Sequence, residues 1–375
     1  MTHFIYRAIT KTFQAAFGSG KIIILYGSRQ SGKTTFVKSF LENQPKGKYF
    51  QCEQSQVRDV LVSWDLPRIM SLIGDADFVI FDEAQIVEGI GNALKILHEA
   101  QPKIQIIVVA SSSFDLQKNM IEPLTWRHRN FILFPFLYRE VRDFQWDDHP
   151  KQYSLEDRLL YGSYYDAIFS SNWEDPKDIL MRIAENYALK DILFFSGIRK
   201  LEILMNLLKV LAYQIGQEVS YGSIAKDFGM SIQTIESYIK ILEKAFIVFR
   251  LPPYNWKKSS GIKKMRKVYF WDTGLRNALI NNFAPLDFRP DRWALFENFF
   301  ISEYAKKIIT FRIHKELSFW RSYTGTKIDL MVEVDGETLA YDVKWKDDRH
   351  SISMSENSPV SEVVLITKDN YMNYL

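Results

Sequence analysis

The chain has 375 residues, enough for two or three domains of about 150 residues and too many for one small binding module. Hydrophobic residues make up 47% and charged residues 25%, which is close to the globular average and excludes disordered and collagen-like proteins. A single cysteine, Cys52, excludes an intrachain disulfide and a zinc site built from several cysteines. The formal charge of +3 is an average over the whole chain, so it neither indicates nor excludes a nucleic-acid partner.

The apolar stretches of the chain are short. The longest are 21–26, 104–110 and 131–138, far below the roughly 20 residues that span a bilayer. The N-terminus shows no apolar core or cleavage site of the secretory type. We therefore expect a cytoplasmic protein without a membrane partner.

The first motif follows a predicted strand, Lys21–Tyr26, and precedes a helix-like segment. Glycines at both ends of such a loop let backbone N–H groups curl around phosphates at the positive end of the following helix. Lys33 would reach the β- and γ-phosphates of a nucleotide, and Thr34 would ligate Mg²⁺. This motif is a predicted P-loop. Its predicted nucleotide-binding residues are Gly27, Ser28, Arg29, Gln30, Ser31, Gly32, Lys33, Thr34 and Thr35.

An acidic pair follows the P-loop by about 50 residues. Residues 76–81 predict an apolar strand, and it ends in Asp82 and Glu83. Asp82 would hold Mg²⁺, normally through water, and Glu83 would orient or deprotonate the attacking water. Such a pair can also mark only a helix N-terminus, where negative charge is favoured. The distance from the P-loop favours the catalytic interpretation.

The next elements complete an α/β pattern. An amphipathic helix is predicted at 90–100 and a strand at 104–110, which ends in three serines. The hydroxyl of Ser112 could sense the γ-phosphate, although an ordinary turn is the alternative. The alternation of strands and helices through residue 135 predicts a parallel sheet with the nucleotide at its carboxyl edge.

The middle of the chain is mostly helical by pattern, and residues 136–200 predict a helical lid. A short helix at 221–228 and a second at 232–245 form a helix-turn-helix candidate, followed by strands at 246–251 and 268–271. This order predicts a winged helix whose basic wing would neutralise DNA phosphates, with a solvated hairpin as the alternative. The predicted nucleic-acid contacts are Lys257, Lys258, Lys263, Lys264, Arg266 and Lys267.

Two strands near the end of the chain alternate apolar and polar residues and are joined by the hairpin signal Asp335-Gly336. If Val334 faces Glu337, then Asp329 faces Asp342 across the hairpin. The same register places Ile328, Leu330 and Val332 on one buried face with Leu339, Tyr341 and Val343. Like charges in opposite positions are unfavourable unless a cation lies between them, and a divalent metal is the natural candidate.

The order of these signals resembles the prokaryotic AAA-type ATPases that carry domain of unknown function 4143 at their C-terminal end. The matching segments are Arg7, Arg29-Gln30 in the P-loop, 82–85, 124–136, 161–165 and 268–276. The resemblance implies that Arg127 is the cationic finger or sensor that stabilises the transferred phosphate. It also implies that residues 161–165 belong to the lid and that 268–276 lead into the last domain.

Asp329 and the following Asp342-Val343-Lys344 form the pattern of PD-(D/E)xK nucleases, with Glu297 as the upstream helical acid. The carboxylates would hold Mg²⁺, and Lys344 would align the attacking water. Similar family members have an acid at the position of Lys327, so a nuclease-like scaffold without hydrolysis is the alternative.

Taken together, these signals predict an ASCE/AAA-like α/β protein. The expected domains are a P-loop ATPase core (1–135), a helical lid (136–200), a winged helix (201–272) and a smaller α/β nuclease-like domain (273–375). The expected function is Mg²⁺-dependent ATP hydrolysis on or near DNA, with ATP and Mg²⁺ as cofactors and homo-oligomerisation left open. The alternative is a nucleotide-gated DNA-binding switch with slow or no ATP turnover and no nuclease activity.

Overall fold

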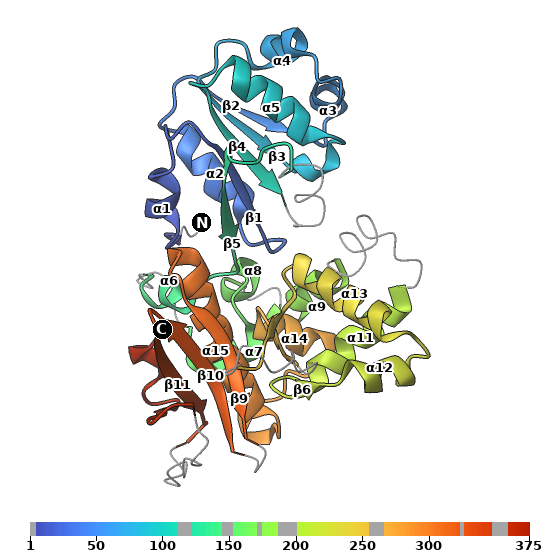
Figure 1. The fold of residues 1–375 in the computed structure, drawn as a ribbon, viewed down its shortest axis with the longest axis vertical. Helices are drawn as coiled ribbons and strands as arrows, with labels where there is room; N and C mark the ends of the chain where they lie inside the picture. The colour runs from blue at the N-terminus through green and yellow to red at the C-terminus, as the bar shows by residue number, and fades with distance from the viewer. Residues whose placement is uncertain are drawn as a thin grey trace.

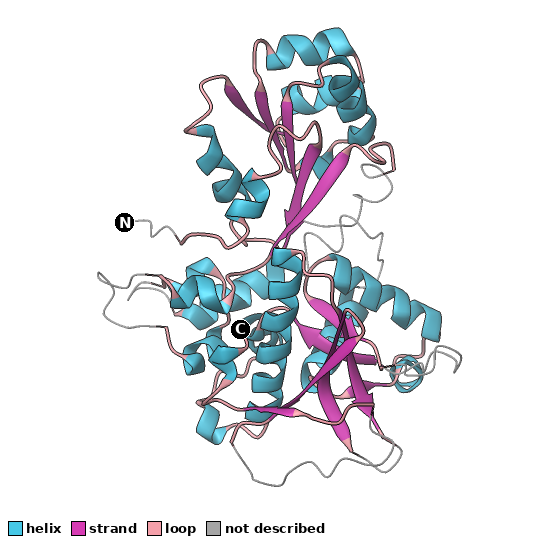
Figure 2. Ribbon diagram, turned by 60° about the vertical axis from the view of Figure 1, so that its left-hand side comes forward, coloured by secondary structure: helices cyan, strands magenta, loops and turns pink. Residues whose placement is uncertain are grey.

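The structure is a computed structural model that describes residues 5–110, 122–144, 153–170, 175–186, 201–254, 266–322, 326–346 and 359–375. An N-terminal α/β part lies at one end of the molecule, and a C-terminal sheet and a group of helices lie next to each other at the other end (Figure 1). Strands gather in both parts (Figure 2). Among the described residues, no helix is both long and apolar enough to cross a membrane.

The N-terminal part is built on a five-stranded sheet in which every neighbouring pair is parallel, as predicted. Its order is β2-β3-β4-β1-β5, where the strands are β1 (Ile22–Gly27), β2 (Gly47–Gln51), β3 (Phe78–Asp82), β4 (Gln105–Ala110) and β5 (His128–Leu133). The helices of this part are α1 (Thr10–Gln14), α2 (Lys33–Leu41), α3 (Ser55–Val62), α4 (Leu66–Ile73), the 3₁₀ turn η1 (Ala84–Ile86) and α5 (Ile90–Ala100).

Strand β1 is apolar without interruption because both of its faces are buried. Ile22 and Ile24 pack into one hydrophobic core, whereas Ile23 and Leu25 pack into a second core on the other face of the sheet. A parallel strand that is covered on both faces needs apolar residues at every position. This double burial fixes the end of β1, and therefore the start of the P-loop, inside a rigid sheet.

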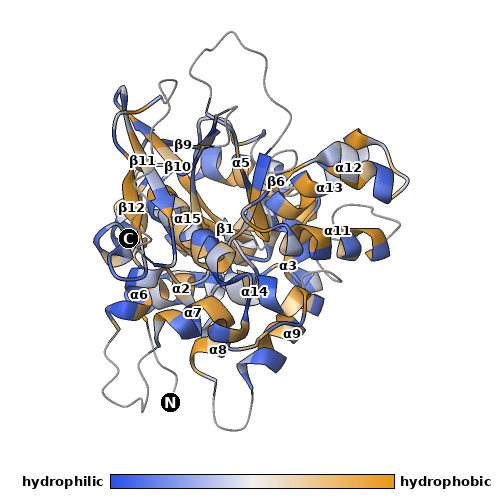
Figure 3. Cartoon of the chain, turned by 90° about the horizontal axis from the view of Figure 1, so that it is seen from below, coloured by the Kyte–Doolittle hydropathy of each residue, from blue (hydrophilic) through white to orange (hydrophobic). Residues whose placement is uncertain are grey.

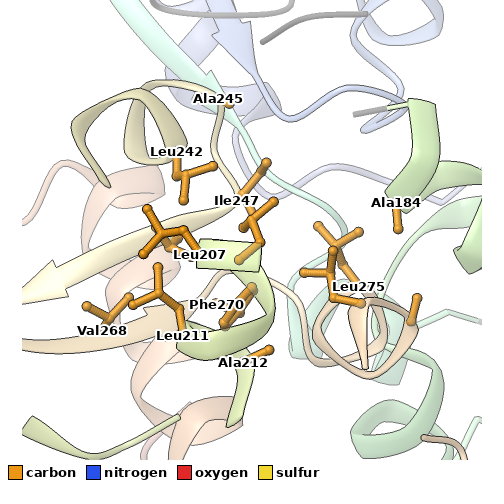
Figure 4. Packing of buried hydrophobic residues seen from close by; sticks show 14 of the residues in the cluster. Ala184, Leu207, Leu211, Ala212, Leu242, Ala245, Ile247, Val268, Phe270 and Leu275 are labelled. Atoms are coloured by element: carbon orange, nitrogen blue, oxygen red, sulfur yellow. The ribbon is translucent and has the colours of Figure 1, made fainter. Parts of the chain in front are cut away.

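The helical part combines segments that the sequence assigned to three domains. The elements are α6 (Tyr138–Arg142), α7 (Leu155–Tyr161), α8 (Tyr165–Ile168), α9 (Pro176–Asn186), α11 (Leu201–Tyr213), β6 (Glu218–Val219), α12 (Tyr221–Asp227), α13 (Ile232–Lys244), β7 (Val248–Leu251), β8 (Arg266–Phe270) and α14 (Thr273–Leu279). The helix α14 packs against α7 and α9. One hydrophobic core contains residues from 164 to 279, and Figure 4 shows part of it, including Ala184, Leu207 and Leu275.

Within this part, the order helix, strand, helix, helix, strand, strand runs from α11 to β8. The three strands form an antiparallel sheet in the order β6-β8-β7. Ser231 caps α13 by accepting a hydrogen bond from the backbone N–H of Thr234 at 3.1 Å. The apolar stripe of α13, formed by Ile235, Ile239 and Leu242, is buried, so the opposite side of this helix faces outward.

The C-terminal part packs the long helix α15 (Arg292–Phe311) against a four-stranded sheet of order β12-β11-β10-β9. Its other elements are the 3₁₀ turns η4 (Leu286–Phe288) and η5 (Tyr371–Asn373) and the strands β9 (Glu316–Arg321), β10 (Lys327–Val334), β11 (Glu337–Val343) and β12 (Val364–Ile366). Hydrophobic and hydrophilic residues alternate along the helices and strands (Figure 3).

The predicted register of the last hairpin is confirmed, because Val334 pairs with Glu337 and Leu330 pairs with Tyr341. Two details of the predicted buried face were wrong. Leu339 is 41% exposed. Ile328 was placed on the same face as Leu330, but the pairing with β9 shifts between Ile328 and Met331. This irregularity turns Ile328 to the other face, where it packs with Met331 and Ala340.

Candidate functional site

The P-loop leaves β1 at a position where only glycine fits. Gly27 has a φ of 147°, and a Cβ atom there would lie 2.0 Å from the carbonyl oxygen of Leu133 in β5. Gly32 has a φ of 86° and stands directly before α2 in the left-handed conformation, which glycine adopts without steric cost. The two glycines of the motif therefore serve a close strand approach and a left-handed turn.

The lysine of the motif is held by the loop itself. The Lys33 ammonium donates to the carbonyl oxygens of Gly27 at 3.0 Å and Ser28 at 2.7 Å. The Ser31 hydroxyl donates to the same Ser28 oxygen at 2.8 Å. A buried positive charge inside a curled backbone at a helix N-terminus fits the phosphates of a nucleotide.

The structure brings the two predicted phosphate motifs together at Asp82. The Thr34 hydroxyl donates to Asp82 Oδ2 at 2.7 Å, across 48 residues of sequence. The backbone N–H of Glu83 donates to Asp82 Oδ1 at 2.9 Å. A hydroxyl and a buried carboxylate in contact beside a P-loop are the oxygen ligands that suit Mg²⁺.

Sequence reasoning missed Tyr49, whose hydroxyl also donates to Asp82 Oδ2, at 2.7 Å. Burial and the neighbouring Asp82 raise the pKa of Tyr49 far above its ordinary value, so the hydroxyl keeps its proton. Tyr49 lies on β2, which is the neighbour of β3 in the sheet. Since no motif marks this strand, the sequence offered no signal for the contact.

Glu83, the predicted base, directly follows β3 in a left-handed conformation with φ 52°. A non-glycine residue pays a steric cost there, and such strain is typical of functional positions. Its carboxylate accepts a hydrogen bond from the side-chain amide of Gln85.

Arg7 connects the P-loop to two other parts of the chain. Its guanidinium donates to the Ser31 carbonyl at 2.8 Å, to the Phe134 carbonyl at 2.6 Å and to Glu140 Oε1 at 3.2 Å. It also stacks 4.4 Å from the centre of the Phe136 ring. The side chain is almost fully buried. The sequence marked Arg7 only through a family resemblance, and these contacts give it a physical role.

The two predicted phosphate-sensing residues, Ser112 and Arg127, have different outcomes. Ser112 lies outside the described residues. Arg127 stands at the start of β5, where its carbonyl accepts from the Ile22 N–H, whereas the P-loop begins at the other end of β1. Six strand residues span about 17 Å, so Arg127 does not reach the nucleotide site of its own chain. Its guanidinium pairs instead with Glu99 at 2.8 Å.

Two further motifs, at 161–165 and 268–276, meet in a buried joint. The Ser163 N–H donates to Asp272 Oδ2 at 2.7 Å, and a Cβ on Gly162 would lie 2.0 Å from Asp272 Oδ1. A Cβ on Gly274 would lie 2.4 Å from the carbonyl group of Tyr161. Burial raises the pKa of the Asp272 carboxyl. The glycines in both motifs therefore permit two chain segments to touch, a role that their sequence did not reveal.

The predicted nuclease residues also come together, but around a lysine. The Lys267 ammonium lies 3.0 Å from Glu297 Oε1 and 3.0 Å from Asp329 Oδ1. The Lys344 ammonium lies 3.2 Å from Asp342 Oδ2. Within the described part of the chain, no group of three or more His, Cys, Asp or Glu side chains is arranged to hold a metal ion.

The pKa directions in this cluster follow from burial and from the lysines. Burial, and then the Asp329 carboxylate, raise the pKa of Asp342 to about 6. Burial also works against ionisation of Asp329, but Lys267 and Lys327 outweigh it and hold the pKa of Asp329 well below its ordinary value. Burial raises the pKa of Glu297.

These contacts correct the prediction that Lys267 touches nucleic acid, because its side chain is buried among carboxylates. Charge counting assigned it to the basic wing, but it lies on β8 and faces the interior. Arg266 is half-buried at the start of the same strand. The remaining predicted contacts, Lys257, Lys258, Lys263 and Lys264, lie outside the described residues.

Two parts of the chain match known protein families. Residues 19–142 match a family described as an AAA domain, and residues 152–286 match a domain of unknown function, DUF8612. The predicted domain of unknown function 4143 is not among the matched families.

The similar proteins are distant. An uncharacterized protein of Mycobacterium tuberculosis is 24% identical over 351 residues, which cover 92% of this chain and 74% of that protein. An uncharacterized protein of Methanocaldococcus jannaschii is 22% identical over 340 residues, which cover 83% of this chain and 77% of that protein. The Walker-type ATPase PABY2304 of Pyrococcus abyssi aligns with a TM-score of 0.48 at 14% identity, over 72% of this chain and 93% of that chain. Residues 19–142, whose P-loop stands on a five-stranded parallel sheet, are therefore similar to AAA domains.

Proposed function

We propose that the chain binds ATP with Mg²⁺ at Gly27–Thr35 and hydrolyses it. The observation that carries this proposal is the 2.7 Å contact between the Thr34 hydroxyl and Asp82 Oδ2. The two groups come from α2 and β3, and their meeting gives the P-loop the second oxygen ligand that a nucleotide-bound Mg²⁺ needs.

Each residue has a separate role in the proposed reaction. A bound Mg²⁺ ion would supply positive charge that offsets the charge developing on the phosphates. Thr34 and Asp82 would hold the ion, and Tyr49 would orient Asp82 through its hydrogen bond. Lys33 would exchange the carbonyls of Gly27 and Ser28 for phosphate oxygens. Glu83 would orient the attacking water and accept its proton.

The nucleotide state has a route to the rest of the molecule through Arg7. A phosphate that reshapes the P-loop changes the position of the Ser31 carbonyl, which Arg7 binds together with Glu140 on α6. Just before α6, the Phe136 N–H donates to the Ser163 carbonyl at 2.9 Å, and Ser163 contacts Asp272. These consecutive contacts support the proposal that ATP hydrolysis moves the helical part relative to the N-terminal sheet.

A calorimetric titration and a phosphate-release assay together test the proposal. The wild type and Lys11→Ala, which changes an exposed lysine on α1, should bind ATP equally. Lys33→Ala should lose binding, and Glu83→Gln should bind ATP but release phosphate at least 100-fold more slowly. Equal ATP affinity in Lys33→Ala and Lys11→Ala would show that the P-loop is not the nucleotide site.

A second candidate function is DNA binding, favoured by the topology of residues 201–270. We infer that α11, β6, α12, α13, β7 and β8 form a winged helix, because the strand order β6-β8-β7 is the one that this connection requires. Gln233, Ser237 and Lys240 are exposed on α13 and suit contacts to a phosphate backbone.

The DNA proposal is tested by reversing the charges of Lys257, Lys258, Lys263 and Lys264, with the buried Lys267 left intact. If the four lysines each contact a phosphate, the slope of log affinity against log salt falls by about 3.6. An unchanged slope would show that the wing lysines do not contact DNA phosphates. In that case ATP titration would still report on the nucleotide site independently.

A further inference from the structure

The C-terminal carboxylate cluster contains its own cation. Lys267 from β8 reaches Glu297 from α15 and Asp329 from β10, with both N–O distances at 3.0 Å. Only 5% of Lys267 is exposed. The ammonium therefore lies between two carboxylates, and the three charged groups come from three different elements.

The neighbours of the ammonium fix it in this position. The Tyr269 hydroxyl, two residues along the same strand, donates to Glu297 Oε1 at 2.7 Å. The backbone N–H of Val343 donates to Asp329 Oδ2 at 3.2 Å. Glu297 Oε1 and Asp329 Oδ1, the two oxygen atoms that face Lys267, are thus presented by a rigid strand and helix framework.

The charges in the cluster balance without a metal. Lys327 lies 3.4 Å from Asp329 Oδ1, and Lys344 lies 3.2 Å from Asp342 Oδ2. With Lys267, three lysines face the three carboxylates of Glu297, Asp329 and Asp342. Burying carboxylates without compensation is costly, and here the chain supplies the compensation itself.

We propose that Lys267 takes the place of a divalent cation in this cluster and makes it a metal-independent ionic joint between β8, α15 and the C-terminal sheet. Mg²⁺ needs its ligand oxygens at about 2.1 Å, and the ammonium already occupies the space between the two oxygens that would supply them. The like charge of Lys267 also repels a second cation. The proposal concerns the C-terminal half and does not depend on the proposed ATPase function.

The proposal has a consequence that can be measured, which is a hidden metal site. Asp342 is 1% exposed, and its Oδ2 lies 3.2 Å from the Lys344 ammonium. Removal of the Lys267 side chain would leave Glu297 Oε1 and Asp329 Oδ1 facing a vacated space, while their contacts with Tyr269 and Lys327 remain. Carboxylate oxygens that face such a space suit a hard divalent cation.

Binding of Mn²⁺ to the full chain, followed by electron paramagnetic resonance, tests the proposal. All proteins carry Asp82→Asn, so that the nucleotide half contributes as little Mn²⁺ binding as possible. When Lys267 is intact, the protein should bind the same amount of Mn²⁺ with and without the change Asp329→Asn. Lys267→Ala should gain one Mn²⁺ per chain, and the further change Asp329→Asn should remove it.

Thermal unfolding gives the matching stability readout. Lys267→Ala should unfold at a lower temperature than the wild type, and Mn²⁺ should recover part of the loss. Lys306→Ala is the matched control, because Lys306 is an equally buried lysine on α15 that pairs with Glu303 at 2.8 Å. It should lose stability without recovery by Mn²⁺.

Two results would overturn the proposal. One is Mn²⁺ bound to the protein with Lys267 intact and released by Asp329→Asn, since the lysine would then not exclude the ion. The other is a folded Lys267→Ala that gains no Mn²⁺. If Lys267→Ala does not fold, Lys267→Met combined with Asp329→Asn removes both charges and should fold. Failure of this pair to recover folding would contradict a joint based on charge balance.

Discussion

The substitution Arg7→Ala should destabilise the N-terminal part strongly, because one buried guanidinium serves three partners. The lost bonds run to the carbonyls of Ser31 and Phe134 and to Glu140. Breaking a buried ion pair by removing one partner costs about 3–5 kcal/mol. Glu140 keeps hydrogen bonds from the N–H groups of Ala8 at 2.6 Å and Leu137 at 2.9 Å, which favours the lower end of that range.

A loss of about 3 kcal/mol lowers the melting temperature by roughly 10 °C for a cooperative unit of the size of residues 19–142. The matched control is Arg127→Ala in the same sheet. Arg127 is 39% exposed and pairs with the half-exposed Glu99, and such surface pairs contribute about 0–1 kcal/mol. Scanning calorimetry of both variants, with Arg7→Lys as the charge-conserving comparison, measures the difference.

Arg7→Lys should fall between the wild type and Arg7→Ala, because a single ammonium cannot serve three separated acceptors at once. If Arg7→Ala and Arg127→Ala melt within about 2 °C of each other, the network around Arg7 does not stabilise the P-loop, and the route from the nucleotide to α6 fails with it.

Three further predictions concern other contacts. Tyr49→Phe removes the hydroxyl that orients Asp82, so the Mg²⁺ concentration for half-maximal ATP turnover should rise by about 2–12-fold, and an unchanged Mg²⁺ dependence would exclude this role. Gly162→Ala should cost at least about 2 kcal/mol more than Gly18→Ala in denaturant unfolding, since both glycines have nearly the same φ but only Gly162 would collide with a neighbour; equal losses would refute the joint with Asp272. Asp342 has a raised pKa of about 6, so the stability that it contributes is complete below about pH 4 and is lost as the pH rises to 6. Asp342→Asn should therefore stabilise the protein by up to about 3 kcal/mol at pH 7.5 and have little effect at pH 4, and a loss of stability at pH 7.5 would contradict the assignment.

Features with a local cause could be predicted from the sequence. The apolar run at 22–25 requires a strand buried on both faces, and the glycines of the P-loop require particular backbone conformations, so the parallel sheet and its loop followed directly. The pairing of Val334 with Glu337 also followed, because a two-residue turn fixes the register of a hairpin.

Features that depend on distant partners could not be predicted. Lysine is rarely buried unless it is paired, and the partners of Lys267 lie 30 and 62 residues further along the chain. Its place in a basic stretch therefore suggested the opposite environment. The position of Arg127 was missed for a related reason, since a motif match carries no information on which edge of the sheet holds the residue.

The hydrophobic core of the C-terminal part has a consequence for how the protein is made. Tyr138 from α6 packs against Tyr371 in that core, with ring centres 5.4 Å apart and a sequence separation of 233. At about 5–20 residues per second, a ribosome needs roughly 10–50 s to deliver the second ring after the first. The N-terminal α/β part can fold during this interval, while Tyr138 and its neighbours lack their final partners. Synthesis that slows within the last two hundred residues should therefore expose this apolar surface for longer, and chaperone demand should rise with that delay rather than with the stability of the finished protein.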